Sequence, residues 1–589
     1  MRRISRRRGL LALPLLLLSA WAHAGVQLVV DGVDDAMKGA ILSSVELSQY
    51  TTRDLSAAQA RRLYDKAPDQ AKDALRPYGY YEAKVDGDLQ QVGKDWRVVL
   101  HVTPGEPVIV TAVNIALDDA AAKLPQVRRT VRAMQAAKDK PLNDGQYDAS
   151  RDAIGAALTA TGFLDAKLVT HRVEVNRAER KATIELAWTA GKRYRFGHVR
   201  FKGSQFREEF LDRYLPFKSG DYFAQDQLLQ LQQALNGADY FSVVNVIPDV
   251  DDARDGVVDI NIELAPAKRT IYTGGPFVGT DTGVGVRGGI EKRWVNDRGH
   301  KWKNELVLAQ NLKTVSTLYT IPMPGTNQRS FNFGANYRDS NTDTSKSRTF
   351  ELVANETRLW YGWTRTIGVH ALSGTFTVGQ KGGEPDTTVG LDHGQSTLVY
   401  PEISLSRKSG DNPTFVRRGW SITLAARSTV GNLLSDANFS QLTADAKWIR
   451  AFAGNNRWIL RGTAGYTKTN DFDDLPPQLR FFAGGDRSVR GYGYESIGPK
   501  NAYDRVIGGP NLLVGSTEVE HYFTRNWGMA AFVDAGNAFA GTDYRPKIGA
   551  GLGVRWLSPV GMIRVDLGVP VHNKDEHGVQ LHLVIGPDL

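Results

Sequence analysis

Residues 270–589 alternate between apolar and polar positions with a period of two, in segments separated by turns rich in Gly, Asn and Asp. In the segment 562–569, one face of an extended chain would carry the apolar residues Ile563, Val565, Leu567 and Val569. The opposite face would carry Met562, Arg564, Asp566 and Gly568. Alternation of this kind predicts β-strands, and its repetition predicts an all-β domain.

The charged face of these strands decides which kind of β domain is expected. A soluble domain would have to bury those charges in its core, which is costly. A transmembrane barrel places the apolar face against lipid and the charged face in a watery lumen, and its closure satisfies the backbone N–H and C=O groups. At roughly 20 residues for each strand and its loop, residues 268–589 predict an antiparallel transmembrane β-barrel of about 16 strands.

Residues 25–266 have a different pattern, in which helical segments alternate with short strands. The sequence of residues 79–85, Gly-Tyr-Tyr-Glu-Ala-Lys-Val, recurs at residues 162–168 and, more weakly, at residues 238–244. Each copy follows a helix-like stretch and precedes a pair of strands; these stretches are residues 57–75, 147–158 and 225–235. A repeat of fixed period predicts tandem domains. The expected α+β domains, each ordered β-α-α-β-β, are residues 25–105, 106–191 and 192–267, ahead of the barrel at residues 268–589.

Residues 1–24 have the composition of a secretory signal peptide. Five arginines precede an apolar run from Leu10 to Ala20, and Ala22-His23-Ala24 fits the A-x-A cleavage pattern. The pair Arg6-Arg7 also allows the twin-arginine route, but the residues that follow fit that signal poorly, so general secretion is favoured. The apolar run is too short for a membrane anchor.

Composition restricts the chemistry that is expected. The 589 residues include no Cys, which excludes a disulfide framework and thiolate metal sites. The formal charge of +9 includes the five arginines of the signal peptide, and the other charges are interspersed with acids, so nucleic-acid binding is not expected. The 11 His lack metal-ligand spacing, and the G-x-G-x-x-G match at residues 283–288 is not followed by a helix. We therefore expect no cofactor and no enzymatic activity.

The Gly-rich segment at residues 482–492 lies between predicted strands and contains Val489-Arg490-Gly491-Tyr492. Two later strands carry acids that can face the lumen. One places Glu518, Glu520 and Tyr522 on one parity, and the next contains Phe532-Val533-Asp534-Ala535-Gly536. An arginine in such a loop can fold inward and pair with lumenal carboxylates.

These segments resemble the BamA/TamA superfamily of POTRA-domain outer-membrane barrels. Residues 489–492 match its V-R-G-[FY] loop signature, and residues 532–536 match its F-x-D-x-G strand signature. The three repeats are similar to POTRA domains, and residues 551–566 resemble the penultimate hairpin of the family. The resemblance covers nearly all of the chain after the signal peptide, with the segments in the expected order.

The resemblance implies a loop that is tucked into the lumen. Arg490 would pair with Asp534, and Glu520 takes the position of the second lumenal acid of the family. The expected functional residues are Val489, Arg490, Gly491, Tyr492, Glu520, Phe532, Asp534 and Gly536. An arginine keeps its charge and offers a planar fork to carboxylates, so the pair would fix the loop position more than it would add stability. The alternatives are an exposed loop arginine for Arg490 and, for Glu518, a generic lumenal acid.

The number of repeats makes the chain most like the TamA group, since BamA proteins typically carry five POTRA domains and two-partner secretion transporters two. This implies a factor in the outer membrane that assists assembly of autotransporters and other barrel proteins. Its POTRA domains would lie in the periplasm. The implied partners are client outer-membrane proteins, the surrounding outer-membrane lipid and a TamB-like protein anchored in the inner membrane.

The resemblance also implies a weak lateral seam between the first and last barrel strands. Residues 282–294 are the expected first strand, and its glycines, Gly283, Gly285, Gly288 and Gly289, would weaken strand pairing and register. A client strand can add at an opened seam by β-augmentation.

Two other functions stay open. A two-partner-secretion pore would need two POTRA units and usually a plugging N-terminal helix, whereas three repeats and no such helix are expected. A passive porin would need neither the tandem domains nor the inward arginine loop.

Overall fold

The computed structural model describes residues 25–586, apart from residues 52, 54, 324–327, 382–387, 413–414, 432–433, 559–560 and 572–577. The signal peptide predicted for residues 1–24 lies outside the described residues. None of the described helices is long and apolar enough to cross a membrane.

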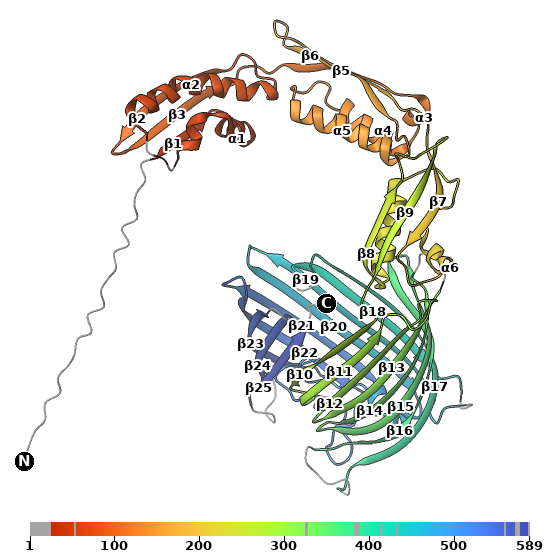
Figure 1. Ribbon diagram of the computed structural model, residues 1–589. Helices are drawn as coiled ribbons and strands as arrows, with labels where there is room; N and C mark the ends of the chain where they lie inside the picture. Colours follow the sequence, from red (N-terminus) through yellow and green to blue (C-terminus); the bar gives the residue numbers. More distant parts are fainter. Residues whose placement is uncertain are drawn as a thin grey trace, which may run out of the picture. The chain divides into compact units, whose positions relative to one another are not determined.

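Three small modules precede the barrel, and each contains a three-stranded sheet (Figure 1). The first consists of β1 (Val26–Asp31), α1 (Asp35–Ser44), η1 (Glu46–Tyr50), α2 (Ala57–Leu75), η2 (Arg76–Tyr78), β2 (Lys84–Val92) and β3 (Asp95–Thr103). The second consists of β4 (Ile109–Ala116), α3 (Asp119–Ala122), α4 (Pro125–Gln135), α5 (Asp144–Ala160), β5 (Lys167–Asn176) and β6 (Lys181–Thr189). The third consists of β7 (Arg195–Lys202), α6 (Glu208–Leu211), η3 (Asp212–Tyr214), α7 (Gln225–Gly237), β8 (Phe241–Pro248) and β9 (Val257–Pro266). In each sheet the last strand along the chain lies in the middle.

Helix α2 shows how the sequence sets a module. The hydroxyl of Ser56 accepts a hydrogen bond from the backbone N–H of Gln59, and the Gln59 side chain accepts one from the backbone N–H of Ser56, so the helix begins with a capping box. Its buried positions recur every three or four residues; they are Ala60, Leu63, Ala67, Ala71, Ala74 and Leu75. This face packs with Val98 and Leu100 of β3 in one apolar core.

The remaining strands form one sheet of 16 strands, in which each strand pairs with the next along the chain. They are β10 (Thr270–Gly279), β11 (Gly283–Lys292), β12 (Lys301–Ala309), β13 (Leu312–Pro322), β14 (Ser330–Asn341), β15 (Ser345–Trp360), β16 (Trp363–Val378), β17 (Asp392–Gly410), β18 (Arg418–Ser428), β19 (Phe439–Phe452), β20 (Asn456–Thr469), β21 (Asn511–Tyr522), β22 (Trp527–Phe539), β23 (Lys547–Ser558), β24 (Gly561–Pro570) and β25 (Gln580–Gly586). All 15 pairings are antiparallel. The predicted fold class and strand number are therefore confirmed.

The two faces of the barrel strands differ as the alternation predicts. Apolar side chains on the outer face are exposed, for example Leu442 (57%) and Leu552 (60%). Neighbouring positions of opposite parity are polar and buried, for example Gln441 and Arg555. The outer face is therefore mainly apolar, as lipid requires, and the fully buried charges lie on the inner face.

The prediction that residues 282–294 form the first barrel strand is wrong. Strand β10 (Thr270–Gly279) comes first, and the Gly-rich segment forms β11. Strand β10 contains Gly274-Gly275-Pro276, which has the composition of a turn. Because β10 lies at the end of the sheet, an unpaired backbone edge is available there for a residue without an N–H. The glycines of β11 still lie next to the edge strand β10, since Gly288 pairs with Gly274.

The third module contacts the turn between β11 and β12. Tyr240 donates a hydrogen bond of 2.5 Å from its hydroxyl to the carbonyl oxygen of Gly299, and Lys301 Nζ donates one of 2.7 Å to the carbonyl oxygen of Ala238. An ion pair of 2.8 Å joins Arg293 Nε and Asp239 Oδ2. A Cβ at Gly299 would overlap an aromatic ring of the module, so glycine permits this close approach.

Gly32 and Gly203 occupy matching places in the first and third modules, directly after β1 and β7. Their φ angles are +85° and +79°, and a Cβ at either would overlap a carbonyl oxygen of the central strand, that of Val102 or Leu264. The repeat thus conserves a backbone geometry that only glycine satisfies without strain.

We expect Gly203→Ala to destabilise the third module by more than the left-handed conformation alone would cost, which is about 1–2 kcal/mol. Gly256→Ala is the matched control, because Gly256 has a φ of +78° and open space around its Cβ position. Amide hydrogen exchange of β7 and β9 in the full chain measures the difference. If amide exchange were accelerated equally in both variants, the overlap between a Cβ at residue 203 and the Leu264 carbonyl oxygen would have no effect on stability.

Candidate functional site

The loop between β20 and β21, residues 470–510, carries the predicted Val489-Arg490-Gly491-Tyr492 segment. This segment is buried, with Val489 0% and Tyr492 1% exposed. Gly491 has a φ of +95°, and a Cβ there would lie 2.7 Å from the Val569 backbone. A Cβ at Gly549 or Gly568 would likewise collide with the backbone of the loop. Because both the loop and the strands have glycine at the points of contact, the loop backbone lies directly against β23 and β24.

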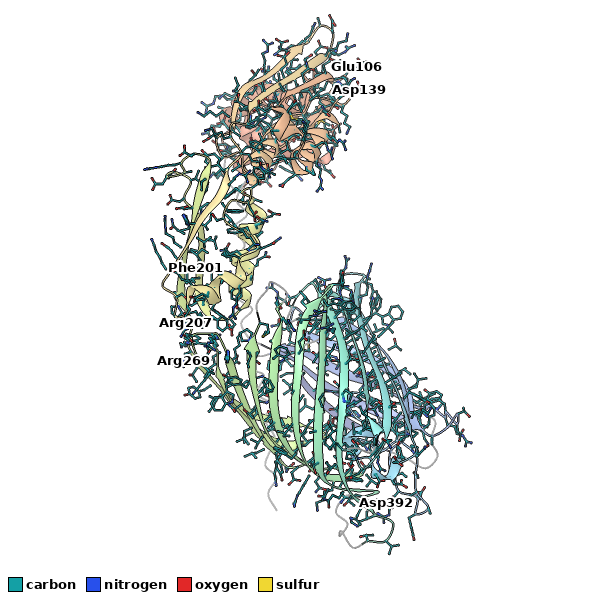
Figure 2. The ribbon with its side chains drawn as sticks, turned by 90° about the vertical axis from the view of Figure 1, so that its right-hand side faces the viewer. Glu106, Asp139, Phe201, Arg207, Arg269 and Asp392 are labelled. Carbon is teal, nitrogen blue, oxygen red and sulfur yellow. The ribbon has the colours of Figure 1, made fainter. Side chains whose placement is uncertain are left out.

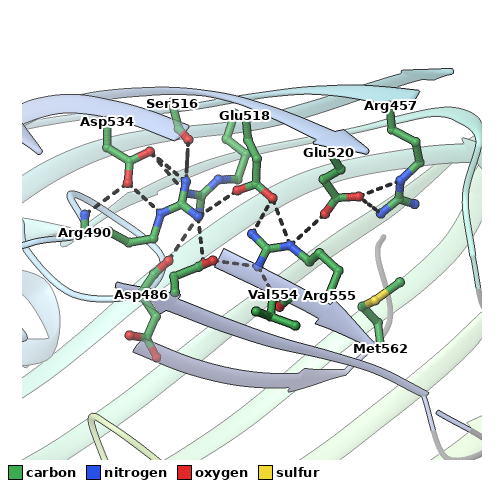
Figure 3. Close-up of polar contacts among 12 residues, drawn as sticks. Arg457, Asp486, Arg490, Ser516, Glu518, Glu520, Asp534, Val554, Arg555 and Met562 are labelled. Atoms are coloured by element: carbon green, nitrogen blue, oxygen red, sulfur yellow. Dashed lines mark hydrogen bonds and ion pairs between the residues drawn. The ribbon is translucent and has the colours of Figure 1, made fainter. Parts of the chain in front are cut away.

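Arg490 points from this loop onto Asp534 of β22 (Figure 3). Its Nε donates to Asp534 Oδ2 at 2.7 Å and its Nη2 to Oδ1 at 3.0 Å, which is a bidentate pair. The backbone N–H of Arg490 also donates to Oδ2, at 3.0 Å. The guanidinium carbon lies 3.4 Å from the ring centroid of Phe532. Loop backbone and side chain are thus held by one fully buried carboxylate.

Two further carboxylates contact the same guanidinium. Arg490 Nη1 lies 2.7 Å from Glu518 Oε2 and 2.9 Å from Asp566 Oδ2. Arg555, which is 0% exposed, joins both acids from the other side. Its Nη2 lies 2.6 Å from Glu518 Oε1, and its Nη1 lies 2.6 Å from Asp566 Oδ1. The loop is therefore tied to β21, β22 and β24 at once.

Glu520 belongs to this network through other arginines. Its Oε1 lies 2.9 Å from Arg555 Nε, and its Oε2 accepts a hydrogen bond of 2.8 Å from Arg457 Nε. The Tyr522 hydroxyl donates a further hydrogen bond of 3.0 Å to Glu520. In the described structure Glu520 thus extends the cluster to β20 without contacting Arg490.

The cluster balances its charges. Four arginines, Arg457, Arg461, Arg490 and Arg555, face four carboxylates, Glu518, Glu520, Asp534 and Asp566. Burial disfavours the charged form of Arg490, but the hydrogen bond to Asp534 and the charges of Glu518, Asp534 and Asp566 outweigh it, so the pKa of Arg490 is raised. A balanced network of this kind fixes position, because removing one member leaves the others uncompensated.

The structure brings most of the predicted residues together. The segment Val489 to Tyr492 lies with Phe532 and Asp534 in one site. Gly536 stands two positions further along β22, where a Cβ would crowd Val514 of β21. Glu518, for which a generic lumenal acid was the alternative, contacts Arg490 directly.

Arg555 and Asp566 were not assigned to the site from the sequence. Both lie in the segment that resembles the penultimate hairpin, at positions of lumenal parity. A charge on the inward face of a barrel strand was the available signal, but the sequence does not specify which inward charges meet.

Asp486, in the same loop, links both ends of the sheet. Thr280, in the turn after β10, donates a hydrogen bond of 2.7 Å to Asp486 Oδ2, and His582 Nδ1 of β25 lies 2.5 Å from Oδ1. Since the Gly491 N–H donates to His582 Nε2 at 3.0 Å, the neutral ring carries its proton on Nδ1 and donates it to Asp486. Burial, together with the charge of Asp486, raises the pKa of the neighbouring Asp281 to about 6.

Replacing Arg490 by Ala would remove the bidentate partner of Asp534, at a cost of about 3–5 kcal/mol. Glu518 and Asp566 would keep Arg555 alone. We expect the barrel to insert but the loop to leave the lumen wall. The folded form should convert to the unfolded form at a lower temperature in gel mobility assays, and the loop should become sensitive to protease. Arg487→Ala, which removes an exposed arginine of the same loop, is the control. An unchanged transition in Arg490→Ala would show that the loop is not locked.

Three family models match the chain. The Omp85 superfamily domain matches residues 295–588, POTRA domain TamA domain 1 matches residues 27–104, and the surface antigen variable number repeat, a POTRA model, matches residues 194–266. The outer membrane protein assembly factor BamA of Nitratidesulfovibrio vulgaris is 23% identical over 415 residues, which cover 68% of this chain and 52% of that protein. This chain therefore spans about half the length of that relative.

A solved structure shows the same fold. The crystal structure of BamA from Haemophilus ducreyi lacking POTRA domains 1–3 superimposes with a TM-score of 0.65 at 18% identity, covering 81% of this chain and 99% of that one. The two POTRA models cover the first and third modules, and the Omp85 model covers most of the 16-stranded sheet. The chain belongs to the Omp85 superfamily, with its barrel in the outer membrane and its POTRA domains in the periplasm.

Proposed function

We propose that the chain inserts or translocates other proteins at the outer membrane, assisting the assembly of autotransporters and other barrel proteins as a TamA-like factor. The observation that carries the proposal is the unpaired seam of the barrel. The hydrogen-bonded order of the described sheet ends at β10 on one side and at β25 on the other. A passive pore gains nothing from such a gap, whereas a machine that admits client strands needs one.

The edge strand β10 suits transient pairing. Gly274 and Gly275 weaken its register, and Pro276 cannot donate a backbone hydrogen bond. An extended client strand that adds to β10 would satisfy the remaining backbone groups by β-augmentation. The Asp486 contacts to Thr280 and His582 support the same view, because they hold the two edges in place without pairing the strands.

Three POTRA modules and the match of the first one to a TamA-type model support the finer assignment. On this proposal the modules engage a TamB-like, inner-membrane-anchored periplasmic protein and incoming clients. The function includes no catalytic step and no cofactor. A two-partner-secretion pore is disfavoured, because such transporters carry two POTRA units.

The test is a disulfide across the seam, and the absence of Cys from the chain makes engineered thiols unambiguous. Cysteines at successive positions of β10 are combined with cysteines in β25, and the pair that crosslinks in membranes is kept. We expect oxidation to abolish insertion of an autotransporter barrel, scored by its heat-modifiable folded form, and reduction to restore it.

A cysteine pair at Thr517 and Val533 is the matched control, because these residues already face each other across β21 and β22. Oxidation there should leave insertion unchanged. If the seam disulfide forms fully and insertion continues at the normal rate, the proposed function is wrong.

A second prediction concerns the bridge between the edges. Asp486→Asn keeps the size of the side chain but removes the charge, so its hydrogen bonds with Thr280 and His582 weaken. We expect this variant to open the seam more often and to raise ion conductance in planar bilayers several-fold. Arg487→Gln, the neighbouring exposed position, should keep the basal conductance. Unchanged conductance in Asp486→Asn would contradict a role for the bridge.

A further inference from the structure

Four arginines lie on the lipid-facing side of the wall formed by β14 to β17. Arg358 and Arg365 are direct partners across β15 and β16. Arg329 precedes β14, and Arg407 belongs to β17. None of these positions is needed for the lumen cluster described above.

Strand parity shows that these side chains face outward. Arg358 shares its face of β15 with Phe350 and Leu352, which are 48% and 49% exposed. Arg365 shares its face of β16 with the exposed Ile367. Arg407 likewise has the parity of the exposed Ile403 on β17, and it lies over the ring of Trp420.

The spacing along β15 gives the depth of the cluster in the membrane. Arg348 and Arg358 stand ten residues apart on the outward face. At about 3.3 Å per residue and a tilt of about 40°, this separation spans about 25 Å, the height of the apolar band of an outer-membrane barrel. The two arginines therefore mark opposite head-group layers, with Phe350, Leu352 and Ala354 between them and Glu356 next to Arg358.

The cluster lies in the periplasmic layer. Strand β10 starts next to the third module, and alternating strand direction brings the end of β15 to the same side. Figure 2 turns this wall to the viewer and shows Asp392, the first residue of β17, at the opposite end of the barrel from Arg269. Trp360 and Trp363, which pair at the end of β15 and β16, are the aromatic residues expected at this interface.

The charges of the cluster are not balanced within the described chain. Among the described residues, Glu356 is the one carboxylate that forms an ion pair with any of the four arginines, and it contacts two of them. Its Oε1 lies 2.9 Å from Arg329 Nε and 3.6 Å from Arg365 Nη2. In the described residues, the Nε atoms of Arg358 and Arg365 are buried without a hydrogen-bond partner. Two guanidinium groups directly opposite each other are destabilising, and an anion between them would relieve the repulsion and accept from the unpaired Nε donors.

Outward arginines at this level extend from β14 to β19, where Arg418 and Arg450 also face outward, and in the described strands they do not continue onto β21 to β24. At the same level on β21 to β24, the outward positions are occupied by His521, Trp527, Trp556 and Ile563. General attraction to a negatively charged membrane would not require this asymmetry, nor would it bury guanidinium nitrogens.

We propose that the arginines of β14 to β17 bind the head-group phosphate of an anionic phospholipid in the periplasmic leaflet. Arg358 and Arg365 would hold the phosphate by charge-assisted hydrogen bonds, and Glu356 would orient Arg365. Arg329 and Arg407 would add charge at the rim, and the acyl chains would lie along the apolar outer face of β15 and β16. The site is independent of the proposed function, since it would equally anchor any barrel with this surface.

The test uses the purified full chain and native mass spectrometry with two probes, dioleoylphosphatidylglycerol and dioleoylphosphatidylcholine. We expect the wild type to retain the anionic lipid in preference to the neutral one. The double variant Arg358→Gln, Arg365→Gln should weaken binding of the anionic lipid about tenfold or more. Arg358→Lys should recover part of the affinity, because it restores charge without the planar fork.

The matched control is Arg418→Gln, Arg450→Gln, because these arginines also face each other outward at the periplasmic end of β18 and β19 but are exposed. An equal loss in both double variants would show general charge attraction and overturn the proposal. So would unchanged lipid retention in the first variant, or displacement of the lipid by millimolar inorganic phosphate. Should the double variant fail to fold, lipid binding is measured with the single variant Arg358→Gln. Arg358 forms no ion pair within the described chain, so its replacement should leave the fold intact.

Discussion

A guanidinium group that cannot lose its charge lies fully enclosed in this barrel, and the surrounding structure follows from that constraint. Arg490 reaches the lumen wall only because Gly491, Gly549 and Gly568 let the loop backbone touch β23 and β24. Once there, it needs carboxylates on several strands at the same level. The charges of these and the neighbouring acids are compensated by Arg555 and Arg457. Strands β20 to β24 and the loop therefore form one electrostatic unit.

This unit fixes the positions of the strands on one side of the barrel. Buried ion pairs join the loop to β21, β22 and β24, and the same acids extend the network to β20 and β23. Strand β10 has its hydrogen-bonded ladder with β11 and a side-chain contact from Thr280, in the turn that follows it, to Asp486. In the described residues no ladder joins β10 and β25, and the loop links the two edges through the contacts of Asp486 with Thr280 and His582. A barrel built in this way can stay intact while its edge strands separate, because the charged network holds the remaining strands in register.

The fold could be predicted because its signals are periodic. Alternation along β19, β23 and β24 is strict, and the glycine-aromatic repeat marks each module once. The first strand was misplaced because Gly274-Gly275-Pro276 has local turn chemistry, and the edge position that tolerates it is a property of the assembled sheet. At the site, Arg490 and Asp534 were found by resemblance, whereas Arg555 and Asp566 were missed because pairing among inward charges depends on strand register and side-chain reach. The outward arginines raise the same difficulty, since Arg358 and Arg365 become neighbours only through the β15–β16 pairing.

The hydrogen bond from Tyr240 to Gly299 and the salt bridge between Asp239 and Arg293 have a mechanical consequence. They fasten the last POTRA module to the β11–β12 turn, and β11 is the ladder partner of the edge strand. A rotation of that module would therefore act first on β11 and on its partner, the edge strand β10. Strands β14 to β17, which carry the outward arginines, lie several strands away from this hairpin in the sheet order. A lipid bound there would hold those strands in place while β10 and β11 move.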